Sequence, residues 1–291
     1  MSDLPPVSVV VPHYRQKETL RRCLDCLKAQ DYAGSVAVYV VDNSEPYALA
    51  DMAQAFPDYH FLHEPKPGSY NARNRALEKI RDGVVAFTDA DCRPRPDWLR
   101  EGVAALMQDA KNGLAAGRVQ VTALNTPPSL LDFLEMATAF RQHDYVREGF
   151  AATANMFTWR RMFDALGLFD GSLRSGGDFN WGHRVHAAGY ALAYAPGAVV
   201  EHDARDAEEF RNKALRLAAA RRDRKLPWWD MPWLALCAAL PWWLIRRLLP
   251  FTHAQLSPGR KCLLLLFGVY TRWQWTLYYI RFRLCGGESP R

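Results

Sequence analysis

The chain has 291 residues, of which 49% are hydrophobic and 23% charged, and its formal net charge is +6. This composition is ordinary for a globular protein and excludes a low-complexity chain, and the length suffices for one large α/β domain plus an appendage. Residues 1–6 carry neither a basic region nor an apolar core. We therefore expect no Sec-type signal peptide, and a protein of the cytosolic side with reduced thiols.

The first two thirds of the sequence alternates strand-like and helix-like segments. β-Branched runs at Val7–Val11 and Val36–Val41 predict strands, the first of them ended by Pro12. Between these runs, apolar residues recur at helical spacing from Glu18 to Ala29. This order favours an α/β fold with a mostly parallel sheet and helices on both faces. The same patterns predict helices at Asn71–Ile80 and Trp98–Met107 and a buried strand at Val84–Thr88.

The middle of the chain continues with shorter elements. We expect a strand at Leu114–Val121 and an amphipathic helix at Leu130–Tyr145. Two short helices, Arg160–Leu166 and Phe179–Ala188, are each predicted to stop at the glycine that follows. The last predicted elements are two closing strands around a Pro196-Gly197 turn, Tyr190–Tyr194 and Ala198–Glu201, and a basic helix at Asp206–Lys225.

Positive charge and tryptophan gather in the C-terminal part of the chain. Residues 211–291 hold 15 Lys and Arg against three acidic residues, a balance of +12, whereas residues 1–210 have a balance of −6. Seven of the ten tryptophans fall between Trp228 and Trp275. We therefore expect an α/β domain at 1–205 and a basic, tryptophan-rich helical region at 206–291, a charge pattern that suits an anionic surface.

The C-terminal region is predicted to associate with a membrane surface through residues 226–285. Trp233–Ile245 is apolar but short, and Cys262–Ile280 contains Arg272 and Gln274, so neither matches the roughly 20 apolar residues of a bilayer span. Tryptophan, tyrosine and arginine suit the headgroup interface, where a basic amphipathic helix can lie. A helical hairpin packed on the core and a dimer face are alternatives. Long aliphatic runs among the tryptophans favour lipid over nucleic acid.

Two acidic residues, Asp89 and Asp91, directly follow the predicted strand Val84–Thr88. Open α/β sheets bind ligands just outside the carboxyl ends of their strands. Two carboxylates there can hold a divalent cation whose remaining positions take phosphate oxygens. The pair therefore indicates a metal–diphosphate site, and solvated loop acids are the alternative interpretation.

Seven segments over residues 7–202, in order, resemble the family 2 inverting glycosyltransferases with a GT-A fold. The resemblance implies a GT-A-type domain that moves a hexose-type sugar from a nucleotide diphosphate, expected to be UDP, to an acceptor hydroxyl. Seven ordered matches are far more specific than any one alone. The segments are Val9–Tyr14, Val40–Ser44, Gly68–Asn74, Ala86–Pro94, Ala154–Phe157, Gly177–Arg184 and Val200–His202.

The resemblance also implies which residues bind the donor. The acid after the second strand, Asp42, would help hold the base, because a carboxylate can accept a hydrogen bond from the ring N–H of uracil; an ordinary turn is the alternative. Arg73, near a helix start, would meet phosphate or the acidic pair, and an exposed surface arginine is its alternative. The donor-binding set is Pro12, Tyr14, Asp42, Ser44, Arg73 and Asp89.

By the same resemblance, the cofactor is Mn²⁺ or Mg²⁺. Asp91 would ligate the ion that bridges the diphosphate, and Asp89 would contact the ribose or the metal. His202 follows a predicted strand and could supply a third ligand, since imidazole suits Mn²⁺ better than Mg²⁺. A purely structural histidine is the alternative.

The resemblance places the catalytic base at Asp178, which would take the proton of the attacking hydroxyl. The family usually has Glu-Asp here, whereas this chain has Gly177-Asp178, a departure that bears on acceptor orientation. Asp178 could instead be the N-cap of a helix that begins near Phe179. Trp181 and Arg184 would shape the acceptor side or pack the helix.

The Q-x-x-R-W motif of processive synthases is missing, because Val269 stands where Arg272-Trp273 would require Gln. We therefore expect an inverting, non-processive hexosyltransferase on the cytoplasmic face of the inner or plasma membrane, peripheral or monotopic, with a lipid-linked or glycan acceptor. One rival is a nucleotidyltransferase, which would need a basic Gly-rich loop that His13–Lys17 does not offer. The other is an inactive membrane-associated scaffold, which the Gly177 departure favours.

Overall fold

A computed structural model describes residues 4–44, 46, 48–223 and 257–285. The chain divides into two compact units, one of residues 1–120 and 140–202 and the other of 121–139 and 203–291. The predicted domain border at residue 205 stays a prediction. The apolar run predicted at Trp233–Ile245 lies outside the described residues.

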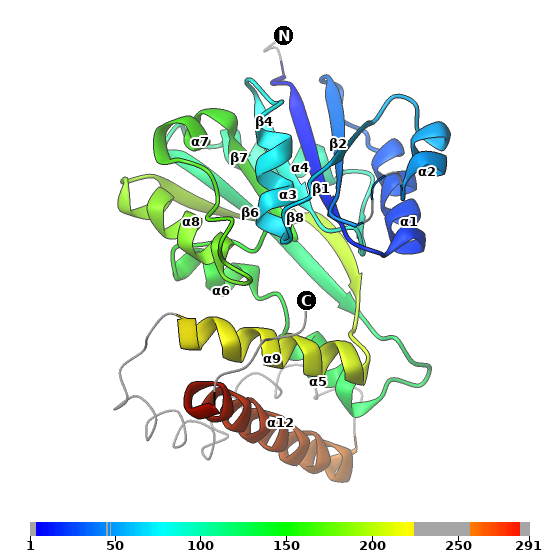
Figure 1. The fold of residues 1–291 in the computed structure, drawn as a ribbon, viewed down its shortest axis with the longest axis vertical. Helices are drawn as coiled ribbons and strands as arrows, with labels where there is room; N and C mark the ends of the chain where they lie inside the picture. The colour runs from blue at the N-terminus through cyan, green and yellow to red at the C-terminus, as the bar shows by residue number, and fades with distance from the viewer. Residues whose placement is uncertain (1–3, 45, 47, 224–256, 286–291) are drawn as a thin grey trace. The chain divides into compact units, whose positions relative to one another are not determined.

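The fold is built on an eight-stranded sheet in the order β3-β2-β1-β4-β7-β6-β8-β5 (Figure 1). The four strands from β3 to β4 are parallel neighbours and form the parallel part of the mostly parallel α/β sheet that the sequence predicted. Strand β7 is antiparallel to β4 and β6, and β5 is antiparallel to β8. The strands are β1 Val7–His13, β2 Val36–Asp42, β3 His60–His63, β4 Val84–Thr88, β5 Cys92–Pro94, β6 Asn112–Thr122, β7 Asn155–Trp159 and β8 Ala191–Asp203.

Helices cover both faces of the sheet, as the alternation of buried side chains along the strands requires. In β1, Val9 and Val11 belong to one core cluster, together with the apolar faces of α1 and α4. Val10, whose side chain faces the opposite side of the sheet, belongs to the other cluster with α3 and α8. The helices of this unit are α1 Lys17–Lys28, α2 Ala50–Ala55, α3 Ser69–Leu77, α4 Trp98–Met107, α6 Gln142–Arg147, α7 Arg160–Leu166 and α8 Gly177–Ala187.

Two predicted strand boundaries are wrong, and both involve proline. Pro12 does not end β1, which runs on to His13. The pairing with β4 stops at Val10, so no ladder bond on that side is lost at Pro12. Similarly, the predicted turn at Pro196-Gly197 is part of one continuous β8. Strand β8 pairs with β5 over residues 200–202, so Pro196 lies outside that ladder.

The predicted helix Leu130–Tyr145 is two helices, α5 Leu130–Thr138 and α6. The break falls at Phe140, whose φ of 48° lies in the left-handed region and interrupts helical geometry. The sequence prediction also omitted α2, β3, β5 and β7, all of which have six residues or fewer.

The second unit contains α5, α9 Ala207–Asp223 and α12 Pro258–Cys285. Buried Glu135 of α5 accepts from Arg205 at 2.6 Å and from Lys213 at 3.4 Å. Burial acts to raise the pKa of the Glu135 carboxyl, but the two cations outweigh it and hold that pKa below its usual value. Within the described part of the chain, no helix is long and apolar enough to cross a membrane.

Candidate active site

The parallel strands β1, β2 and β4 all end at the same edge of the sheet, and polar side chains follow there. His13 and Asp42 are the last residues of β1 and β2, and Asp89 comes directly after β4. Strand β1 lies between β2 and β4, so the strands that follow β1 in the chain are added first on one side of it and then on the other. Ligands in open α/β sheets bind at such a switch point. The fold therefore places the D-x-D pair where a ligand site is expected.

Arg73 of α3 forms an ion pair with the first acid of that pair. Its Nη2 donates to Asp89 Oδ1 at 2.5 Å, and Arg73 is only 3% exposed. The alternative of an exposed surface arginine is therefore wrong. Its contact is with the acidic pair rather than with solvent, and a charge-assisted bond of this kind fixes the carboxylate's position.

The second acid of the pair faces a histidine from β8. His202 Nε2 lies 3.3 Å from Asp91 Oδ2, and the His202 ring packs against Phe140 at 4.9 Å between centroids. An imidazole nitrogen and a carboxylate oxygen at this separation fit two ligands of one cation. Among the residues that the structure describes, no group of three or more His, Cys, Asp or Glu side chains is arranged to hold a metal ion. Asp91 and His202 could therefore supply two ligands to a divalent cation, and their role as metal ligands stays a prediction.

Asp178 lies in the first turn of α8, and Tyr70 of α3 reaches it. The Tyr70 hydroxyl donates to Asp178 Oδ1 at 3.1 Å, and the Phe179 N–H donates to the same oxygen at 2.9 Å. The helix begins at Gly177 with Gly176 as its N-cap, so the alternative of Asp178 as the N-cap is wrong. The role of Asp178 as catalytic base stays a prediction.

The same helix α3 also holds the loop that leads to α8. Asn71 Nδ2 donates to the Gly171 carbonyl at 3.0 Å. Asn74 Nδ2 donates to the Phe169 carbonyl at 2.8 Å, and its Oδ1 accepts from the Phe169 N–H at 3.1 Å. The four side chains Tyr70, Asn71, Arg73 and Asn74 therefore join the D-x-D loop to the loop and helix that carry Asp178. Of these four residues only Arg73 was predicted to have a role, although all four lie within one resemblance segment, Gly68–Asn74.

The two acceptor-side candidates pack the protein around this loop. Trp181 is fully buried, stacks on Phe163 at 4.3 Å and donates from its indole N–H to the Gly167 carbonyl. Arg184 donates to the carbonyls of Leu166 and Leu168. Of the two interpretations left open by the sequence, the structure favours packing, because both side chains bond to the backbone before α8.

The nucleotide side of the site is a fixed polar network at the ends of β1 and β2. His13 Nε2 accepts from the Gln16 N–H at 3.0 Å, so Nδ1 carries the hydrogen and donates to Asp42 Oδ1 at 3.0 Å. The Ser44 N–H donates to the same oxygen. Burial acts to raise the pKa of the Asp42 carboxyl, but the hydrogen bonds from His13 and Ser44 outweigh it and lower that pKa. Asp42 is therefore held as a carboxylate.

The remaining nucleotide-side candidates line the loop after β1. Pro12 pairs with Val41 inside the sheet, and Tyr14 is exposed at the start of the loop. The Arg15 guanidinium lies 5.2 Å from the Tyr14 ring centroid, and the Arg15 N–H donates to Ser44 Oγ. The structure brings these residues together beside Asp42, and their role in donor binding stays a prediction.

Two asparagines that were not predicted to have a role support the site. Asn43 accepts from the Gly68 N–H at 2.7 Å and donates to the Glu64 and Lys66 carbonyls, so it sets the loop from which α3 begins. Gly68 has a φ of 120°, a conformation that favours glycine. Asn155, fully buried in β7, bonds the Trp98 indole and two backbone carbonyls. Both lie inside resemblance segments, which is the only signal that could have found them.

The acids of the site act on one another electrostatically. Burial raises the pKa of the Asp89 carboxyl, and the negative charges of Asp91 and Asp178 raise it further. Arg73 and His202 oppose this shift. Because the negative charges of these three acids repel one another, a bound cation would stabilise the site.

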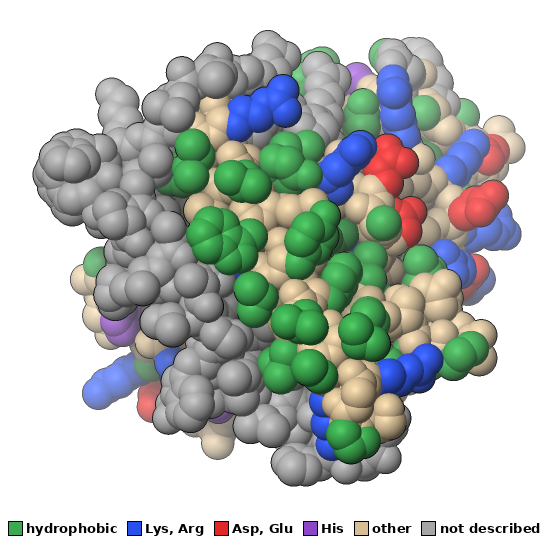
Figure 2. All heavy atoms as spheres, turned by 90° about the horizontal axis from the view of Figure 1, so that it is seen from below, with side chains coloured by type: hydrophobic (Ala, Val, Ile, Leu, Met, Phe, Trp, Pro, Cys, Tyr) green, Lys and Arg blue, Asp and Glu red, His purple; other side chains and the backbone are tan. Residues whose placement is uncertain are grey.

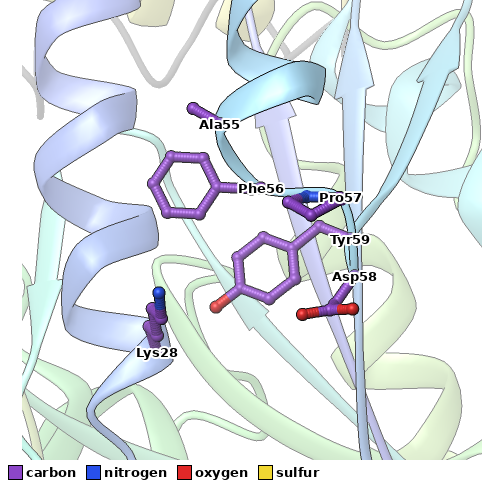
Figure 3. Close-up of a pocket in the computed structure, with 6 residues that line it drawn as sticks. All are labelled: Lys28, Ala55, Phe56, Pro57, Asp58 and Tyr59. Atoms are coloured by element: carbon purple, nitrogen blue, oxygen red, sulfur yellow. The ribbon is translucent and has the colours of Figure 1, made fainter.

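A small hollow elsewhere in this unit contains none of the candidate residues. It lies between the end of α1 and the turn from α2 to β3, and Phe56 and Tyr59 stack across it at 5.4 Å between centroids (Figure 3). Its lining has no cluster of catalytic groups, so we assign it no role.

Replacing Arg73 and replacing Arg75, which lie on the same helix, should lower the free energy of unfolding by different amounts. Arg73→Met would leave a mostly buried carboxylate without its cation, and we expect it to lower the free energy of unfolding by about 2 kcal/mol. Arg75→Met is the matched control, because Arg75 forms an exposed pair with Glu78 and should cost roughly 0.5 kcal/mol or less. Urea unfolding of both variants measures this, and equal losses would contradict the assigned role of Arg73.

Residues 8–167 match the family model described as Glycosyl transferase family 2. The chain is 30% identical over 222 residues to glycosyltransferase AglE of Haloferax volcanii, and the alignment covers 74% of this chain and 73% of that relative. It is 29% identical over 209 residues to the pre-mycofactocin glycosyltransferase of Mycobacterium tuberculosis, covering 68% of this chain but only 43% of that relative.

Solved structures share the fold. The mannosyltransferase PcManGT from Pyrobaculum calidifontis, in complex with GDP-Man and Mn²⁺, aligns with a TM-score of 0.62 at 22% identity, covering 99% of this chain and 89% of that one. GalNAc-T7 with UDP, GalNAc and Mn²⁺ aligns with a TM-score of 0.56 at 17% identity, covering 78% and 52%. These likenesses confirm the GT-A-type α/β fold. The family model, together with the similarity to AglE, shows that the chain belongs to glycosyl transferase family 2.

Proposed function

We propose that this glycosyltransferase is a metal-dependent, inverting and non-processive enzyme that moves a hexose-type sugar from a nucleotide diphosphate to an acceptor hydroxyl. The observation that carries the proposal is the single helix α3, which contacts both the D-x-D loop and Asp178. A donor site without a base beside it would suit a binding protein, whereas the two joined by one rigid element suit a transferase. The inactive scaffold is disfavoured, because Asp178 keeps its place despite the Gly177 departure.

The donor is proposed to be a UDP-sugar. The His13 ring and the Ser44 backbone N–H both donate to Oδ1 of Asp42, so Oδ2 is the oxygen that would receive the ring N–H of a uracil. The structural neighbours named above were solved with GDP-Man or with UDP, each with Mn²⁺, which supports a nucleotide diphosphate with a divalent metal. Asp91 and His202 would hold the ion, which when bound neutralises charge on the diphosphate as a Lewis acid.

The chain's own residues then have distinct tasks. Asp178 would accept the acceptor's hydroxyl proton while the hydroxyl oxygen bonds to the anomeric carbon and the bond to the diphosphate breaks, its electron pair leaving with the nucleotide. Oδ2 is the oxygen for this step, because Oδ1 already accepts two hydrogen bonds. Arg73 would keep Asp89 in position beside the ribose or metal. Attack opposite the leaving group gives inversion.

We further propose that the acceptor is lipid-linked, in the synthesis of a cell-surface polysaccharide or glycolipid, and that α12 rests on the cytoplasmic face of the membrane. Residues on one stripe of α12, spaced three and four apart, are 40–62% exposed: Leu263, Leu266, Tyr270, Trp273 and Leu277. Figure 2 shows such apolar side chains gathered on one surface with Lys and Arg around them. The helix sequence has five basic residues and no acidic one, so a second copy would bring like charges together, whereas anionic lipid would balance them.

Nucleotide binding tests the donor site. We expect calorimetry to show UDP binding that requires Mn²⁺ and is lost in Asp91→Ala, because the variant removes one of two protein ligands. GDP measured in parallel reports the base preference, and Asp109→Ala, an acid outside the site, should bind UDP as the wild type does. If neither nucleotide bound with Mn²⁺ present, the transferase mechanism as proposed would be abandoned.

Vesicle flotation tests the membrane proposal. The wild type should float with vesicles containing phosphatidylglycerol far more than with pure phosphatidylcholine, and high salt should weaken this. Replacing two residues of the stripe, Leu266→Gln with Leu277→Gln, should reduce flotation roughly tenfold or more through lost apolar burial. Met107→Gln, which changes an exposed apolar side chain on α4, is the control. A wild type that stays unbound would remove the lipid surface from the proposal.

A further inference from the structure

The contact between Tyr70 and Asp178 depends on a residue that departs from the family pattern. The backbone of Gly177 approaches the Tyr70 ring so closely that an added Cβ would lie 2.7 Å from Cε2 and 2.8 Å from Cδ2 and Cζ. Real Cβ contacts are never this short. The φ of Gly177 is not in the left-handed region, unlike the 80° of Gly176, so Gly177 is required for space rather than for conformation.

The Tyr70 ring is enclosed by its neighbours and cannot shift without disturbing them. It is 6% exposed, packs against Phe169 at 5.6 Å between centroids, and has the Arg73 guanidinium 5.6 Å from its own centroid. Moving the ring would therefore disturb both the core beneath α3 and the arginine that binds Asp89. A side chain at position 177 can be accommodated only if the Tyr70 hydroxyl leaves Asp178.

The hydroxyl is also suited to hold a carboxylate in one orientation. Burial and the nearby charge of Asp178 raise the pKa of the Tyr70 hydroxyl, so it stays protonated at neutral pH and acts as a donor. The Tyr70 hydroxyl and the Phe179 N–H both donate to Oδ1 of Asp178. In the described residues, Oδ2 accepts no hydrogen bond, so it remains available to the substrate.

We infer that Tyr70 and Gly177 form a matched pair in which Tyr70 is the positioning residue for the base and Gly177 makes room for it. This rests on the proposed function, because it takes Asp178 as the base. The Gly-Asp pair is then no sign of lost activity. The Tyr70 ring occupies the space that a side chain at position 177 would need, and its hydroxyl reaches Asp178.

The kinetic test uses Tyr70→Phe, which keeps the ring and deletes the donor. UDP-glucose and GDP-mannose serve as probes, with water as the acceptor and nucleotide release as the readout. We expect Tyr70→Phe to slow release about tenfold, the loss expected from one charge-assisted hydrogen bond, while Mn²⁺-dependent UDP affinity stays within about twofold. Tyr32→Phe also deletes a hydrogen-bonded hydroxyl, to the Pro5 carbonyl, and should leave the release rate unchanged.

The claim that Gly177 makes room for the Tyr70 ring is tested without substrate by a double-mutant cycle. Gly177→Ala should lower Tm by about 5 °C in the wild type, as overpacking does, but by no more than about 2 °C in a Tyr70→Ala background where the ring is gone. Equal shifts in the two backgrounds would overturn the pairing. Tyr70→Phe releasing nucleotide at the wild-type rate would overturn the positioning role alone, whereas a wild type that binds no UDP with Mn²⁺ would instead overturn the proposed function.

Discussion

The ion pair between the buried Arg73 and the partly exposed Asp89 is the constraint from which the rest of the site follows. It ties the first turns of α3 to the end of β4, and it does so from a side chain that is almost fully enclosed. Once α3 is placed in this way, the neighbouring side chains Tyr70, Asn71 and Asn74 necessarily meet the segment that leads into α8. One helix of nine residues thus sets the distance between the donor-side acids and Asp178.

The placement of α3 itself is secured from the other side. Asn43, after β2, bonds both ends of the loop that precedes the helix, and Asp42, one residue earlier, is held by His13. The carboxyl ends of β1, β2 and β4 are therefore cross-linked by side chains before any ligand arrives. Preorganisation of this kind would lower the cost of bringing the proposed donor, metal and base into one geometry.

The sequence predicted most of what depends on local pattern. Val84–Thr88 and Trp98–Met107 were predicted to the residue, because their apolar periodicity coincides with the buried face. The single helix proposed for Leu130–Tyr145 failed at Phe140, where one backbone angle overrides a favourable pattern. The site was predictable as a set of candidates, since Asp89, Asp91, Arg73 and Asp178 lie in resemblance segments. The Tyr70–Asp178 hydrogen bond could not be predicted, because it joins residues 108 apart in the chain. The close packing of Gly177 against the Tyr70 ring could not be predicted either, because neither residue type nor spacing indicates it.

The most direct measurement is a crystal structure of the protein with UDP and Mn²⁺, with the metal located by its anomalous scattering. We expect one manganese peak between Asp91 and His202, beside the diphosphate, with the Arg73–Asp89 and Tyr70–Asp178 contacts both retained. A manganese ion bound away from Asp91, or a diphosphate that displaces α3 from either acid, would contradict the claim that this one helix organises the transfer site.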